Sequence, residues 1–103
     1  MTQMNDQETI VKVLDHLGKR PESSQREIAE HAGISLGKAN YVLQALVGKG
    51  MIKTENFLNS KNKWGYRYIL TSRGAKEKMN ITKNFIRKKM AEYEVLLSEH
   101  PEI

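Results

Sequence analysis

Residues 24–52 read SQREIAEHAGISLGKANYVLQALVGKGMI, a stretch with the spacing of a helix-turn-helix. Gly33 stands where the chain must bend sharply between two short helices, because glycine adopts a left-handed backbone conformation at little cost. Ala29 and Ala39 are small enough to let the two helices approach closely, and Gly50 ends the second helix. The apolar residues of that second helix recur at helical spacing: Ala39, Val42, Leu43 and Leu46.

Polar residues mark where each of these helices begins. Ser24 and Glu27 have the spacing of a capping box, in which a hydroxyl and a carboxylate each satisfy a free backbone N–H group, so a helix is expected over about 25–32. Ser35 is a favourable N-cap for the second helix, which is expected to run to about Lys49. Units of this kind usually insert their second helix into the major groove of DNA.

The flanking sequence predicts a winged helix. Residues 5–18 carry an apolar stripe at helical spacing, which is typical of a helix packed into a core. The runs 51–57 and 66–70 are rich in β-branched and aromatic residues and flank turn-forming residues at 59–63, which predicts a β-hairpin with a basic tip. The expected fold class is therefore mainly α (α+β), a winged helix-turn-helix with a two-stranded wing and a long C-terminal helix.

The last element is a long helix with an apolar stripe of its own. Thr71 is its expected N-cap, and no proline interrupts the chain from Ala75 to Leu97. At about 1.5 Å per residue such a helix extends over roughly 35–40 Å, so it should project past a three-helix core. The stripe favours pairing with a second copy of the chain, and folding back onto the first helix is the alternative. The candidate dimerisation residues are Met79, Phe85, Ile86, Met90, Tyr93 and Leu97.

Length and composition limit the class of protein. The 103 residues are enough for one structural unit, in which residues 1–71 are expected to bind DNA and residues 72–103 to dimerise. The chain has no cysteine, which excludes disulfides, thiolate nucleophiles and cysteine-based zinc sites. The N-terminus has no signal-peptide pattern, and no apolar run approaches the roughly 20 residues of a membrane span. We expect a cytoplasmic, nucleoid-associated protein with no membrane partner.

Positive charge is concentrated in the middle of the chain. The net charge is +5, and residues 1–34 hold four Lys/Arg against six Asp/Glu. Residues 35–91 hold thirteen Lys/Arg against two Asp/Glu, and residues 92–103 hold no Lys/Arg against four Asp/Glu. Double-stranded DNA is the natural partner for this distribution. A basic helix can also be an ordinary solvated face, but here the basic segment coincides with the groove-reading motif.

The outward face of the second helix carries the candidate base-reading residues. Asn40 and Gln44 can each form two hydrogen bonds with adenine and are the first candidates for base contacts. Lys38 can reach guanine or phosphate, and Tyr41 can stack on a sugar or touch a thymine methyl group. Gly37 would allow close approach to a DNA backbone. The alternative is that the polar side chains are ordinary surface residues.

A second set of residues is expected to hold the DNA backbone. Ser35 would bind a phosphate through its hydroxyl and the N–H groups at the helix N-terminus. Lysine and arginine side chains would bind other phosphates or, at the tip of the wing, enter the minor groove. Trp64 is expected to pack under the wing, with a sugar contact as the alternative. The cationic candidates are Arg26, Lys49 and Lys53, together with Lys61, Lys63 and Arg67 on the wing.

The sequence contains no constellation for catalysis or for a metal ion. His16, His31 and His100 lack metal-ligand spacing and are expected at the surface or half-buried. No glycine-rich phosphate loop follows a predicted strand, and no nucleophile–base set is suggested. We expect neither an enzyme nor a cofactor or metal site.

Four segments carry a resemblance to a known family. The helix-turn-helix pattern and the segment LTSRG at 70–74 resemble the MarR family of bacterial transcriptional regulators, and the resemblance covers nearly the whole chain. The wing sequence NSKNKWGY at 59–66 and the tail RKKMAEYE at 87–94 resemble a short subgroup associated with exopolysaccharide gene clusters. The resemblance implies a homodimer that binds a pseudo-palindromic operator, usually as a repressor.

Two departures from the family pattern narrow the expectations. The wing is rich in Asn and Lys and lacks the Asp of the family's Asp-x-Arg pair. The chain also lacks the extra helices that frame a ligand pocket in longer members, so a small-molecule effector is not expected. Two rival functions are a protein-interaction winged helix, whose recognition face would be apolar or acidic, and an architectural DNA-binding protein, which would show no preferred operator.

Overall fold

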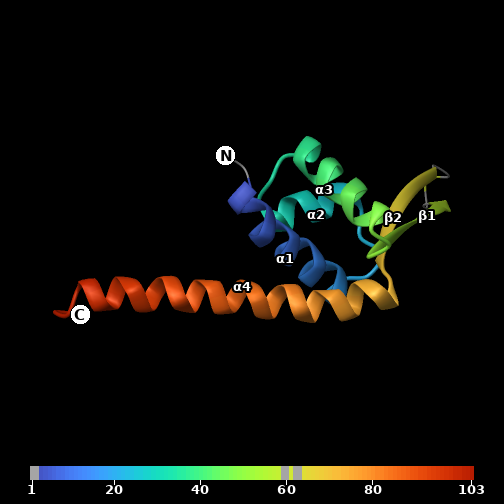
Figure 1. The fold of residues 1–103 in the computed structure, drawn as a ribbon. Helices are drawn as coiled ribbons and strands as arrows, with labels where there is room; N and C mark the ends of the chain where they lie inside the picture. The colour runs from blue at the N-terminus through green and yellow to red at the C-terminus, as the bar shows by residue number, and fades with distance from the viewer. Residues whose placement is uncertain (1–2, 59–60, 62–63) are drawn as a thin grey trace.

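The computed structural model describes residues 3–58, 61 and 64–103, arranged as a helical head, a wing and one long helix (Figure 1). The head contains α1 (Gln3–Lys19), α2 (Gln25–Ala32) and α3 (Leu36–Gly48). The wing strands are β1 (Ile52–Leu58) and β2 (Trp64–Leu70), and the long helix is α4 (Ser72–Glu99). The predicted fold class, a mainly α winged helix-turn-helix with a long C-terminal helix, is confirmed.

The turn between α2 and α3 forms through the residues that predicted it. Ser24 Oγ accepts a hydrogen bond from the Glu27 N–H (3.2 Å), and the Ser24 N–H donates to the Glu27 carboxylate (2.9 Å), which completes the capping box. Gly33 adopts φ 71°, and the N–H of Ile34 donates to the carbonyl of Ala29 (3.0 Å). A left-handed glycine thus closes α2 and turns the chain into α3.

Both ends of α3 are capped. Ser35 Oγ accepts a hydrogen bond from the N–H of Lys38 (3.0 Å). At the other end Gly50 adopts φ 74°, and the N–H of Met51 donates to the carbonyl of Leu46 (3.0 Å). The free carbonyls of the last turn are therefore satisfied, and the chain leaves α3 directly into β1.

The core lies between the three helices of the head and the base of the wing. Leu43 and Leu46 face inward as predicted, and each such side chain stabilises the fold by roughly 1.5–3 kcal/mol. Val42 is buried as well, because α3 contacts both α2 and β1. The buried apolar residues are Val13, Leu14, Leu17, Ile28, Ala29, Ala32, Ala39, Val42, Leu43, Leu46, Met51, Ile52 and Tyr68.

The wing is an antiparallel pair whose register runs from Ile52 opposite Leu70 to Leu58 opposite Trp64. The second strand starts two residues earlier than predicted because Gly65, which suggests a break in a strand, continues the ladder. A side chain at Gly65 would lie only 3.1 Å from the ring of Phe57, so the glycine leaves room for that ring. The predicted packing of Trp64 lies outside the residues whose side chains the structure describes.

The start of α4 is fastened to the junction between α3 and β1. Thr71 Oγ1 accepts a hydrogen bond from the N–H of Gly74 (2.9 Å) and lies 2.7 Å from the carbonyl oxygen of Gly50, to which it can donate. The N–H of Thr71 donates to the carbonyl of Met51 (3.0 Å). The predicted N-cap of α4 therefore also connects that helix to the end of α3.

The long helix runs antiparallel to α1 and then projects beyond the head (Figure 1). Lys78 Nζ lies 3.8 Å from a carboxylate oxygen of Asp15, and Lys88 Nζ donates to Gln7 Oε1 at 3.5 Å. Packing against α1 therefore ends near Lys88, and the molecule measures 61 Å along its longest axis against 26 and 24 Å. The first half of α4 folds back onto α1, while its second half extends past the head. Within the described part of the chain, none of the helices is long and apolar enough to cross a membrane.

One histidine is an exception to the expected surface positions. His16 is only 6% exposed, whereas His31 and His100 are exposed. The His16 Nε2 lies 2.9 Å from Ser23 Oγ, and because that hydroxyl donates to the carbonyl of Arg20 (2.7 Å), the imidazole is the donor to Ser23. The expectation for His16 was wrong because its face of α1 is covered by α2, whose His31 ring lies 4.6 Å from the ring of His16.

The buried imidazole predicts that the fold becomes less stable in mild acid. Burial lowers the pKa of His16, and the nearby His31 lowers the pKa further, so folding disfavours the charged ring. The unfolded chain has a histidine pKa of about 6.5, so stability is retained above that pH and is lost as pH falls toward the lowered pKa of the folded state. Urea unfolding between pH 8 and pH 5 should show a falling midpoint. The fall should be smaller in His16→Gln and unchanged in His100→Gln, and equal slopes in all three proteins would contradict the assignment.

Candidate DNA-binding surface

The outward face of α3 brings together the residues predicted to read bases. Gln44 is exposed and Tyr41 is 70% exposed on the side of the helix that faces away from the core, and Asn40 is exposed at the edge of this face. Lys38 is half-buried at the first turn of the helix. The two amide side chains and the exposed aromatic ring together offer hydrogen-bonding groups and an apolar surface, as contact with base edges requires.

Small residues extend this face toward both ends of α3. Gly37 lies one turn before Tyr41, and Ala45 and Gly48 follow Gln44. A side chain at Gly37 would have Ser35 Oγ as its nearest neighbour at 4.0 Å, and one at Gly48 would meet nothing within 4 Å. Packing within the chain therefore requires neither glycine. Ala45 is also exposed, which the sequence prediction missed, although its place one turn after Tyr41 could have indicated it.

The two glycines provide a matched test for close approach of DNA. Alanine at either position should stabilise α3 by up to about 1 kcal/mol, because neither added methyl group meets an obstacle. Gly37→Ala should nevertheless weaken DNA binding if a DNA backbone approaches the first turn, whereas Gly48→Ala should leave binding unchanged. Thermal unfolding and fluorescence anisotropy with a DNA duplex measure the two effects. Equal affinity in both variants would remove Gly37 from the contact surface.

The predicted backbone contacts lie at the edges of this face. Lys49 caps the end of α3, Lys53 follows on β1, and Arg26 lies on α2, and all three side chains are exposed. Ser35 is exposed at the start of α3, where its oxygen already caps the helix. Lys61 is exposed at the tip of the wing, and Lys63 lies outside the described residues.

A further cation, Arg73, escaped the sequence analysis. It lies in the first turn of α4, and together with Lys49 and Glu77 it lines a hollow between that helix and the end of α3. Its side chain comes within 3.9 Å of the position that a side chain at Gly50 would take. The signal that could have found it is its place two residues after Thr71, the N-cap that fastens α4 to this junction.

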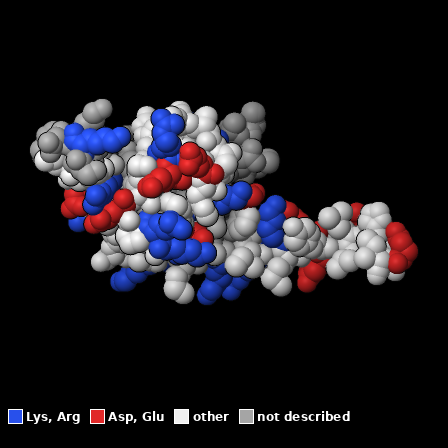
Figure 2. All heavy atoms as spheres, turned by 180° about the vertical axis from the view of Figure 1, so that it is seen from behind, with Lys and Arg blue, Asp and Glu red and all other residues white. Residues whose placement is uncertain are grey.

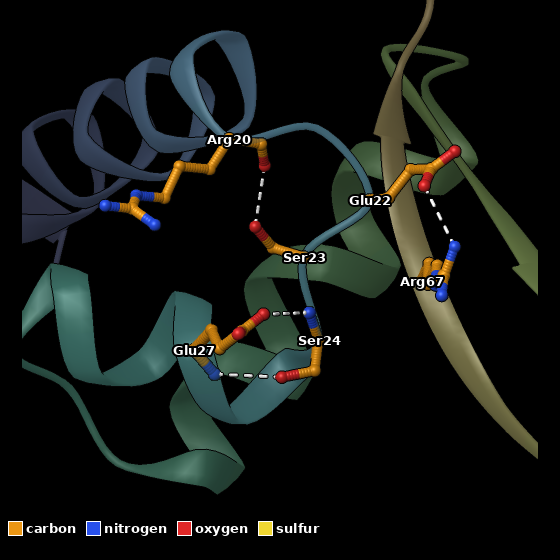
Figure 3. A network of polar contacts seen from close by, with 6 residues as sticks. All are labelled: Arg20, Glu22, Ser23, Ser24, Glu27 and Arg67. Atoms are coloured by element: carbon orange, nitrogen blue, oxygen red, sulfur yellow. Dashed lines mark hydrogen bonds and ion pairs between the residues drawn. The ribbon is translucent and has the colours of Figure 1, made fainter. Parts of the chain in front are cut away.

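Arg67 has partners within the protein. Its guanidinium Nη1 donates to a carboxylate oxygen of Glu22 at 2.9 Å, and its Cζ lies 3.9 Å from the centre of the Phe57 ring. Figure 3 shows the side chain pointing from β2 toward the connection between α1 and α2. The prediction that Arg67 binds phosphate remains untested, but its guanidinium faces Glu22.

Charge is distributed along the molecule as it is along the chain. Figure 2 shows Lys and Arg side chains, with Asp and Glu among them, over the head and the first part of α4, while the far end of α4 shows Asp and Glu. Because the excess of Lys and Arg lies in residues 35–91, a polyanion is attracted to that part of the molecule and repelled by the tip of α4. Among the residues that the structure describes, no group of three His, Cys, Asp or Glu side chains is placed to hold a metal ion.

Comparison with known proteins identifies the class of fold. Residues 6–53, from α1 to the start of β1, match the family described as winged helix-turn-helix DNA-binding. No curated protein matched in sequence. The matched stretch, just under half of the chain, is thus similar to winged helix-turn-helix domains of the DNA-binding class.

Solved structures place the fold more narrowly. A candidate transcriptional regulator from Thermoplasma acidophilum is 20% identical with a TM-score of 0.76, over 91% of this chain and 95% of that one. MarR from Staphylococcus aureus, solved with salicylate and kanamycin, is 21% identical with a TM-score of 0.61, over 82% of this chain. ZitR from Lactococcus lactis, a zinc-responsive MarR family member, is 21% identical with a TM-score of 0.62, over 88% of this chain.

The match to the MarR proteins is partial in length. This chain spans 55% of the Staphylococcus aureus protein and 60% of the Lactococcus lactis protein. The fold is thus that of MarR-family regulators, which confirms the predicted resemblance at the level of structure.

Proposed function

We propose that this protein is a MarR-type transcriptional regulator that binds DNA sequence-specifically. The observation that carries the proposal is the outward face of α3, where Asn40, Tyr41 and Gln44 are exposed together. Exposed basic side chains near this face, Arg26 on α2, Lys49 at the end of α3 and Lys53 on β1, can contact the phosphate backbone. A recognition face for protein would instead be apolar or acidic.

The working form proposed here is a homodimer paired through α4. Met79 is 71% exposed, Ile86 50% and Met90 57%, along one stripe of the helix. Phe85 is half-buried, and Tyr93 and Leu97 continue the exposed stripe. A second copy would cover these side chains and place two recognition helices in successive major grooves about 34 Å apart. The operator would then be a pseudo-palindrome.

The finer assignments follow the sequence of the wing and the tail. The resemblance to short regulators of exopolysaccharide clusters suggests a bacterial repressor of exopolysaccharide genes, working in the cytoplasm on the nucleoid. We propose that the protein regulates transcription by binding DNA and that it does not catalyse a reaction. No cofactor is proposed. Binding of a small-molecule effector is not proposed.

Selection of genomic fragments by the purified protein tests the function directly. At about 0.15 M salt, close to the physiological value, the recovered fragments should share an inverted repeat with half-sites one helical turn apart. Enrichment without a shared motif would indicate an architectural DNA-binding protein instead of a sequence-specific regulator. Failure to retain DNA at any salt concentration would point to a protein partner for the α3 face.

Gln44 provides the residue-level test. Gln44→Ala should weaken binding to the selected operator by about 1–3 kcal/mol and hardly change binding to random DNA, because an amide bound to a base edge reads sequence. Lys53→Ala is the matched control and should weaken both by similar factors. Anisotropy titrations of both duplexes measure these changes. An equal loss on operator and random DNA would remove Gln44 from the set of reading residues.

A further inference from the structure

The wing is attached to the connection between α1 and α2 at several points. The N–H of Tyr68 on β2 donates to the carbonyl of Ser23 (3.0 Å), so Ser23 forms an isolated bridge beside the wing. The Tyr68 hydroxyl donates to Gln25 Oε1 at 3.4 Å, and Gln25 Nε2 donates to the carbonyl of Leu36 in the first turn of α3 (3.2 Å). The connection therefore contacts the wing through Ser23, and Gln25, the first residue of α2, links the wing to the recognition helix.

Glu22 lies in this connection with an unusual backbone conformation. Its φ is 64°, and within the described residues no other residue except glycine has a positive φ. Glutamate adopts this conformation at a cost that glycine would avoid, so its surroundings must hold it there. Glutamate, unlike glycine, has a carboxylate, and this carboxylate binds the guanidinium of Arg67 at 2.9 Å (Figure 3).

Arg67 joins three segments through this contact. Its backbone belongs to β2, its guanidinium lies over the ring of Phe57 on β1, and its charge pairs with Glu22. Glu55 stands directly opposite Arg67 in the ladder, yet the guanidinium reaches across to Glu22. The pair therefore connects both strands of the wing to the head, in place of an ion pair within the wing.

We propose that Glu22 and Arg67 are positioning residues that set the angle of the wing relative to α3. Through this angle they determine whether the wing lysines reach the DNA backbone. Arg67 acts through Glu22 and does not itself bind phosphate. The inference rests on the proposed function, because it concerns how this chain binds DNA.

The sign of one substitution distinguishes positioning from simple electrostatics. Glu22→Gln removes a negative charge from a DNA-binding protein, which by charge alone should tighten binding. If the pair positions the wing, binding should instead weaken by about two- to fivefold, the range of an exposed ion pair. The dependence of affinity on salt should also become shallower, by about one unit of slope for each phosphate contact that the wing loses. Glu55→Gln makes the same charge change opposite Arg67 and should not weaken binding.

Combining substitutions separates the two roles of Arg67. In the positioning role, Glu22→Gln, Arg67→Gln and the double variant should lose affinity equally, because either change breaks the same pair. The exchange Glu22→Arg with Arg67→Glu should recover most of the parental affinity. If Arg67 binds phosphate directly, Arg67→Gln will weaken binding in either background, Glu22→Gln will tighten it, and the exchange will not recover affinity. That result would overturn the inference.

Amide hydrogen exchange tests the same anchor without DNA. The Tyr68 amide, which donates to Ser23, should exchange faster in Glu22→Gln than in the parent and in Glu55→Gln. Unchanged exchange at Tyr68 would overturn the inference, whatever DNA the protein binds. The parent protein could fail to bind DNA while the Tyr68 amide exchanges faster in Glu22→Gln as expected. That result would support the role of Glu22 and Arg67 in holding the wing and would contradict the proposed function.

Discussion

Replacing Ile86 and Met90 together by aspartate should convert the protein into monomers that bind a palindromic operator at least about 100-fold more weakly. Each added carboxylate would have to lose water inside an apolar interface, at an effective cost of several kcal/mol per ion. The monomer should remain folded, because Ile86 is 50% and Met90 57% exposed, so the head does not use them. Sedimentation equilibrium measures the association, and far-UV circular dichroism verifies that the helices remain.

The chain offers a close control for this double substitution. Asn80 and Asn84 are exposed on the same helix with the same four-residue spacing, about 80° or more around the helix from the apolar stripe. Asn80→Asp with Asn84→Asp therefore adds the same charge and should leave the dimer intact. A double variant at Ile86 and Met90 that still sediments as a dimer would place the interface elsewhere.

Gly74→Ala should lower the free energy of unfolding by about 1–3 kcal/mol, although alanine favours helices over glycine by up to about 1 kcal/mol. A methyl group at Gly74 would overlap the carbonyl oxygen of Met51 and would lie 2.9 Å from a methyl carbon of Leu70. The carbonyl belongs to the backbone at the base of the wing, so it cannot swing aside as a flexible side chain would. The first turn of α4 must therefore move away from β1.

Urea unfolding measures this loss of stability. Gly48→Ala is the control, because the same substitution in open surroundings should be neutral or stabilising. A Gly74→Ala protein as stable as the parent would show that the junction yields without cost. Loss of operator binding in Gly74→Ala at temperatures where it remains folded would further indicate that the position of α4 matters for recognition.

Features encoded by neighbouring residues were predictable from the sequence. The bounds of α2 follow from Ser24, Glu27 and Gly33, all of which act within one turn of the helix end. The outward face of α3 follows from a fixed helical period, so Asn40 and Gln44 were found on it without knowledge of the fold.

Features that depend on distant residues were not predictable in this way. His16 is buried because α2 crosses α1, and Arg67 pairs with a carboxylate 45 positions earlier in the chain. The need for glycine at position 74 arises from the carbonyl of Met51, 23 residues away, and no local pattern records that contact. A single sequence specifies such pairings only through the completed fold.

The continuity of α4 has a consequence for the phase of the two half-sites on DNA. Thr71 fastens the helix to the end of α3, and one unbroken helix leads from there to the apolar stripe. In the proposed dimer, one residue inserted between Lys83 and Ile86 would rotate the stripe from Ile86 onward by about 100° relative to Met79 and the head. Because the DNA double helix repeats every 10–10.5 base pairs, the two heads would then face different sides of the duplex. The angular offset between the half-sites is thus encoded in the number of residues between Thr71 and the stripe.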